Sequence, residues 1–149
     1  KKLLLVLVGP PLLVFSVAIG VVWWDRGAPP GFRPPVQDIE IRDLNRDHRG
    51  VRLAGTGHYT VRIRQGDDDD ESWHLFPLFP EGDLAPGEIR AMIRTQVEPE
   101  PYTDFEDIVV EGLARPPGHL VPRSAREALL QRGYVFHERF VLVEAFDED

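Results

Sequence analysis

The stretch VRLAGTGHYTVRIR, residues 51–64, alternates apolar and polar side chains along most of its length. The apolar positions that share one face are Val51, Leu53, Tyr59, Val61 and Ile63. A period of two residues predicts an antiparallel β-strand that buries one of its faces. Two glycines inside the stretch, Gly55 and Gly57, indicate a bulge or a sharp bend of the kind at which a barrel turns.

Further strands are expected on the C-terminal side of this stretch. The polar run QGDDDDE (65–71) separates it from SWHLFPLFP (72–80), so the two apolar stretches predict a hairpin. The segment EIRAMIRTQV (88–97) fits a strand slightly better than a helix. Strands are also expected at EDIVVEGLA (106–114) and YVFHERFVLVEAF (134–146).

One short helix is expected in front of the last strand. Ser124 and Glu127 have the spacing of a capping box, and Gly133 is placed to end the helix. Five strands and one short helix predict a mainly-β domain, built as a small OB-like barrel. The helix of that fold usually lies between the third and fourth strands, whereas here it precedes the fifth.

The N-terminal segment from Leu3 to Trp24 carries no charged side chain over 22 residues. As a helix it would be about 33 Å long, which matches the hydrocarbon core of a bilayer. Lysines precede the segment and two tryptophans, Trp23 and Trp24, end it, as is typical of a membrane span. We expect an uncleaved single-pass transmembrane helix. A signal peptide cleaved near Ala18 and a core helix of a soluble fold are the alternatives.

Two prolines, Pro10 and Pro11, lie inside the apolar segment. Proline kinks a helix and frees carbonyl groups, which in lipid need partners from neighbouring helices or from water. The kink therefore favours packing against other integral membrane subunits, with a bend near the leaflet surface as the alternative. Lys1 and Lys2 favour a cytoplasmic N-terminus, with the C-terminal domain in the periplasm or outside the cell. Arginine greatly outnumbers lysine, as GC-rich coding sequences favour, and this indicates a bacterial source. With the expected span, the expected location is therefore the bacterial inner membrane.

Three segments follow from these patterns: a transmembrane anchor (1–24), a linker and turn segment rich in proline and glycine (25–50), and a β-rich extramembrane domain (51–149). The formal net charge of the chain is −8, which disfavours nucleic acid as a partner because its phosphates would be repelled. Cysteine is absent, which excludes a disulfide framework, a thiolate nucleophile and a cysteine-ligated metal. No cofactor is predicted.

Catalytic and metal-binding patterns are weak. The run Asp67–Asp70 with Glu71 reads as a solvated hairpin tip, since it lacks the alternating spacing of a calcium loop. A second candidate begins at Asp43, but it has His48 at position six and Ala54 at position twelve, so a turn is favoured. The histidines are expected on the outer surface, although His58 and His74 lie on strands predicted to pair. We therefore predict no catalytic residue and no metal ligand.

The strand at 72–80 is apolar on both faces, which predicts either burial on both sides or one side against a partner. We expect partner contacts from both the span and this strand. The candidate partner-binding residues are Pro10, Pro11, Trp23, Trp24, Trp73, Phe76 and Leu78.

Together these features predict a non-catalytic accessory subunit of a larger membrane protein complex, in contact with integral membrane subunits and the lipid bilayer. The alternative is a membrane-tethered periplasmic carrier or chaperone. In layout, an N-terminal anchor followed by a small β-barrel, the chain resembles the haem chaperones of cytochrome c maturation. That family attaches haem through a histidine followed closely by a tyrosine. No tyrosine follows His137 here. An enzyme, for instance a hydrolase, is the third possibility.

Overall fold

The computed structural model describes residues 33–66 and 72–147. The chain divides into two units, residues 1–33 and 34–149, and every helix and strand below belongs to the second. Within the described residues, no helix combines the length and the apolarity needed to cross a bilayer. The predicted span at 1–24 lies outside the described residues, as does the aspartate run at 67–70.

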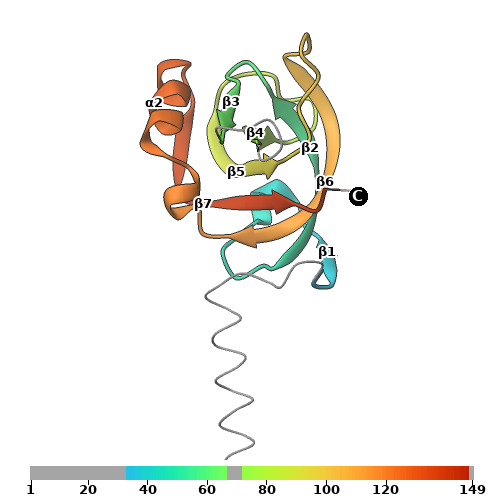
Figure 1. The fold of residues 1–149 in the computed structure, drawn as a ribbon. Coiled ribbons are helices and arrows are strands. Elements are labelled where there is room, and N and C mark those ends of the chain that lie inside the picture. The colour runs from blue at the N-terminus through green and yellow to red at the C-terminus, as the bar shows by residue number, and fades with distance from the viewer. Residues whose placement is uncertain (1–32, 67–71, 148–149) are drawn as a thin grey trace, which may run out of the picture. The chain divides into compact units, whose positions relative to one another are not determined.

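Five strands close into a barrel (Figure 1). They are β2 (Gly50–His58), β4 (Trp73–Phe79), β5 (Glu88–Thr95), β6 (Phe105–Arg115) and β7 (Val135–Ala145). The order around the ring is β2-β6-β7-β5-β4, and β4 returns to β2 at Phe79↔Thr56 and Leu78↔Gly57. The pairs are antiparallel except β5 with β7, which run parallel. The expected mainly-β domain with one helix and an OB-like barrel is thereby confirmed.

The domain begins earlier than the sequence pattern indicates. The short strand β1 (Val36–Asp38) pairs in parallel with the start of β2. The 3₁₀ turn η1 (Ile41–Asp43) places Ile41 in the core, next to Leu44. The second half of the segment assigned to a linker, 25–50, is therefore part of the barrel domain, because its few apolar residues supply buried surface to the core.

The alternating stretch at 51–64 forms two strands rather than one. β2 ends at His58, and after a break β3 (Ile63–Gln65) pairs with β4. Val51, Leu53 and Tyr59 pack inside the barrel, as the alternation predicts. Val61 and Ile63 join a different cluster outside the barrel wall, so their predicted placement on the same face was wrong. The break redirects the chain after Tyr59.

A second apolar layer covers one side of the barrel. The 3₁₀ turn η3 (Gly118–Leu120) and α2 (Arg123–Gln131) connect β6 to β7, and Figure 1 shows α2 (orange) beside the ring. Ala125 and Leu129 of α2 pack with residues on the outward faces of β4, β5 and β7, among them Leu75, Met92 and Leu142. The outer surface of these strands is thus already occupied by the chain itself.

The helix ends as expected but begins differently. Pro122 occupies the N-cap position, so Ser124 lies inside the first turn and makes no capping bond. Glu127 instead forms an ion pair with Arg123, at 2.8 Å. The capping-box prediction was wrong because proline already supplies the extended backbone of a helix start. Gly133 has φ of 89°, the left-handed conformation expected of a helix terminator.

Candidate functional site

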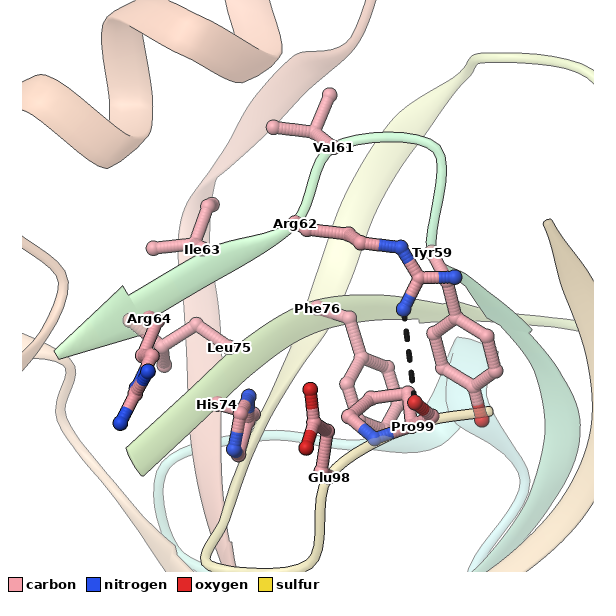
Figure 2. Close-up of a pocket in the computed structure, with 10 residues that line it drawn as sticks. All are labelled: Tyr59, Val61, Arg62, Ile63, Arg64, His74, Leu75, Phe76, Glu98 and Pro99. Carbon is pink, nitrogen blue, oxygen red and sulfur yellow. Dashed lines mark hydrogen bonds between the residues drawn. The ribbon is translucent and has the colours of Figure 1, made fainter. Parts of the chain in front are cut away.

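A cavity of about 160 Å³ opens beside β3 and the N-terminal half of β4. Its walls come from three segments, residues 59–64, 74–76 and 98–99 (Figure 2). Apolar walls are formed by Val61, Ile63 and Phe76, and the polar groups that converge on the space are His74, Glu98 and two arginines, Arg62 and Arg64. The space lies at the break between β2 and β3, where residues 59–62 leave the line of β2 before β3 pairs with β4.

The imidazole of His74 is one of the titratable groups that line the cavity. Burial lowers its pKa below the ordinary 6.5, and Arg64 and Arg62 lower it further, while Glu98 opposes the shift. Figure 2 shows the Glu98 carboxylate beside the imidazole. His74 is therefore mainly neutral at pH 7, and a neutral imidazole carries one donor and one acceptor nitrogen.

Arg62 fixes one wall of the cavity. Its Nη2 donates to the carbonyl oxygens of Glu100 and Pro101, both at 2.8 Å, and to that of Thr103 at 3.1 Å. A fourth contact, from Nη1 to the Pro99 carbonyl oxygen at 3.5 Å, is the one drawn in Figure 2. One guanidinium thus holds the turn between β5 and β6, and that turn carries Glu98 and Pro99.

A larger groove of about 380 Å³ lies on the other side of the same turn. It shares Tyr59, Phe76, Glu98 and Pro99 with the smaller cavity. The Tyr59 hydroxyl donates to Glu106 at 3.2 Å, and its ring meets Phe76 edge-on at 4.8 Å between centroids. Tyr59 therefore lines both spaces, and burial raises the pKa of its phenol, so it stays protonated.

The groove combines an apolar floor with an acidic rim. Its floor contains Ile93, Ile108 and Val110, which also belong to the barrel core or pack against it. Exposed apolar side chains continue outward from this floor at Val97 and Val109, which are 62% and 65% exposed. The charged residues among those that line it are Glu98, Glu100, Glu106 and Glu111.

The smaller cavity lies below the roughly 300–1,000 Å³ of sites that hold drug-sized ligands. Among the residues that the structure describes, no three histidine or carboxylate side chains are grouped to hold a metal ion. The Asp43 segment forms a turn in which the side-chain oxygen of Asn45 accepts the Asp47 N–H at 2.9 Å.

His58 is buried, which the alternation of apolar and polar residues did not predict. It lies on the outward side of β2, but it is fully buried because Phe79, Phe105 and Tyr134 cover it. Its Nε2 donates to the Asp83 carbonyl at 2.7 Å, so Nδ1 accepts the Tyr134 hydroxyl at 2.9 Å. The expected surface position of His58 was wrong.

His58 and His74, which lie on strands predicted to pair, are near opposite ends of β4. His58 packs against Phe79 at the C-terminal end of β4, whereas His74 lies near the start of that strand, opposite Arg64 and Thr95. His137 lies on β7, where its Nδ1 accepts the Arg139 N–H at 3.1 Å. His48 Nδ1 likewise accepts the Asn45 N–H, at 3.2 Å.

The predicted partner-binding residues of β4 have different surroundings. Phe76 and Leu78 face the barrel interior and are 4% and 0% exposed, so the chain itself covers them. Trp73 is half-buried, and the Arg94 guanidinium lies 3.7 Å from the centre of its ring. Arg94 also pairs with Glu144 at 3.3 Å. Pro10, Pro11, Trp23 and Trp24 lie outside the described residues.

The groove was missed because its residues are scattered over five segments of the sequence. The nearest signal was the acidic, proline-broken run VEPEPYTDFE (97–106), which supplies part of its rim. Comparisons of the chain with protein-family models, with curated proteins and with solved structures found no match.

Proposed function

We propose that this protein is a non-catalytic accessory subunit of a membrane protein complex, and that its barrel domain binds a partner through the acidic groove. The observation that carries this proposal is the groove itself, an accessible hollow with an apolar floor and a single sign of charge at its rim. Exposed apolar surface rimmed by polar groups is typical of protein-binding sites.

The apolar segment at 3–24 supports the membrane part of the proposal, since its length and its flanking lysines and tryptophans are those of a span. In this proposal the span places the domain at the surface of the inner membrane, on the periplasmic or extracellular side. The partners are integral membrane subunits. We favour an accessory subunit over a carrier, because the smaller cavity offers little room for a cargo of cofactor size.

Purification of the full chain from native membranes in a mild detergent tests the proposal. We expect the chain to elute with integral membrane subunits at a constant ratio across size exclusion and a second, charge-based separation. Elution of the intact chain alone, as a monodisperse species with no associated subunit, would overturn it. Val109→Lys should reduce recovery of the partner, and Val135→Lys, at an exposed valine of similar accessibility outside the groove lining, serves as its control.

A further inference from the structure

The half of β6 that lines the groove has an open backbone edge. β7 pairs with β6 only between Gly112 and Arg115. Residues 105–111 of β6 continue past the end of β7, with β2 on one side and no strand from the described part of the chain on the other. The groove therefore lies where a longer β7 would run.

Backbone bonds at both ends of β6 show which groups face this open side. The Asp104 carbonyl accepts the Tyr59 N–H at 2.8 Å, and the Ala114 N–H donates to the Arg49 carbonyl at 2.7 Å, so even-numbered residues bond toward β2. The Glu111 carbonyl accepts the Phe146 N–H at 2.8 Å, on the opposite side.

Because bonding directions alternate along a strand, the odd-numbered residues point their backbone groups away from β2. Phe105, Asp107 and Val109 therefore present N–H and C=O groups at the open edge. An exposed edge of this kind is a template for an added strand.

The charge of the groove indicates which side chains such an added strand would carry. Glu98 and Glu100 stand on the wall formed by the turn after β5, and Glu106 and Glu111 on the wall formed by β6. Glu111 is paired with Arg52 at 2.5 Å, and Glu106 accepts the Tyr59 hydroxyl. The net rim charge favours a cationic occupant, and the floor of Ile93, Ile108 and Val110 favours apolar side chains.

We propose that the open edge of β6 accepts an extended segment of a partner protein as an added β-strand, in which apolar residues alternate with lysine or arginine. In this arrangement the apolar side chains enter the groove floor, the basic side chains meet the glutamates, and the partner's backbone bonds to Phe105, Asp107 and Val109. The inference rests on the proposed function and specifies the partner's chemistry.

Selection of short peptides from a random display library against the purified full chain tests this inference without the native partner. We expect the selected peptides to alternate apolar and basic residues. A peptide selected in this way should lose about tenfold or more in affinity for Val109→Lys and keep its affinity for Val135→Lys. N-methylation of alternate peptide amides should have a similar effect, because it removes backbone donors. Affinity should also fall with added salt.

Four results would overturn the inference: no enriched peptide, enrichment without basic residues, affinity unchanged by Val109→Lys, or affinity unchanged by N-methylation in both alternation registers. A dimer that Val109→Lys dissociates, with no peptide selected, would assign the edge to a second copy of this chain and overturn the inference equally. Failure of the membrane purification, with successful selection here, would reject the complex while retaining the edge. Success of the membrane purification with failure of the peptide selection would reject the added strand at β6 and retain the complex.

Discussion

At the scale of single residues, His58 makes the native state sensitive to acid. Burial lowers its pKa below 6.5, although the Asp83 carbonyl opposes the shift. The unfolded chain therefore takes up a proton as the pH falls through 6.5, while the native state resists it. The free energy of unfolding is consequently expected to decrease as the pH falls below about 6.5, since the unfolded state then binds more protons.

His58→Phe should flatten this pH dependence between about pH 7 and pH 5, as measured by urea unfolding. It should also cost about 1–3 kcal/mol at pH 7, because the Tyr134 hydroxyl and the Asp83 carbonyl lose their partner. His119→Phe, at an exposed histidine, should retain the slope of the parent chain. An equal slope for the parent and His58→Phe would contradict this account.

Gly55 allows the close contact at which β2 meets β4. A Cβ atom there would lie 2.3 Å from the Phe79 carbonyl oxygen and 2.7 Å from the Ile41 side chain. We expect Gly55→Ala to lower the free energy of unfolding by about 1–3 kcal/mol, because neither neighbour can retreat easily. Gly87→Ala, where the new methyl group would meet Phe79 at an ordinary 3.5 Å, is the matched control and should change little. Equal stability of the two variants would show that the contact between β2 and β4 tolerates a side chain at position 55.

Residue patterns in the sequence revealed which face each strand position takes, but not what covers it. Gly55 was expected at a bulge or a sharp bend, whereas the structure shows an unbroken register with β6 and a close approach of β4 at this residue. His58 was correctly placed on the face opposite Val51 and Leu53, yet it is buried by Tyr134, a residue 76 positions away. Alternation reports a two-sided strand and carries no information about a second layer contributed by a distant segment.

At the scale of elements, α2 is the cover of the barrel's outer side. Leu129 is 0% exposed and packs in the outer cluster, whereas its neighbour Leu130 is 51% exposed. Leu129→Ala should lower the free energy of unfolding by about 2–5 kcal/mol, the usual cost of a core leucine. Leu130→Ala should cost well under about 1 kcal/mol. Chemical denaturation of the two variants tests this prediction. Similar losses in the free energy of unfolding would mean that α2 does not pack as described.

The outer layer also explains the strand at 72–80. Its two apolar faces left a choice between core packing and a partner surface. The structure places Phe76 and Leu78 inside the barrel and Leu75 and Phe79 beneath the outer layer, so both faces are covered internally. The sequence could identify the double-sided burial, and it could not identify α2 as the second cover because contacts between distant elements depend on the full topology.

At the scale of the whole molecule, the barrel was predictable and the groove was not. Strand count and turn spacing indicate a barrel, because each is a local pattern. The groove depends on β7 ending before β6 does, and thus on a difference in length between two strands. It also depends on Arg62 fixing a turn nearly forty residues away, through three carbonyls at 2.8–3.1 Å.

The proposed membrane tether makes a prediction for the full chain. If residues 3–24 span the bilayer, the chain should stay in the membrane fraction through an alkaline carbonate wash. Leu13→Lys with Val14→Lys places two charges near the centre of the segment, at a cost of about 5–7 kcal/mol, and should move the chain to the supernatant. The control, Gly27→Lys with Ala28→Lys, adds the same charge beyond the apolar segment and should not. Recovery of the parent chain from the aqueous fraction, or a mature N-terminus beyond Ala18 by mass spectrometry, would reject the tether while leaving the β6 edge to be judged by its own experiment.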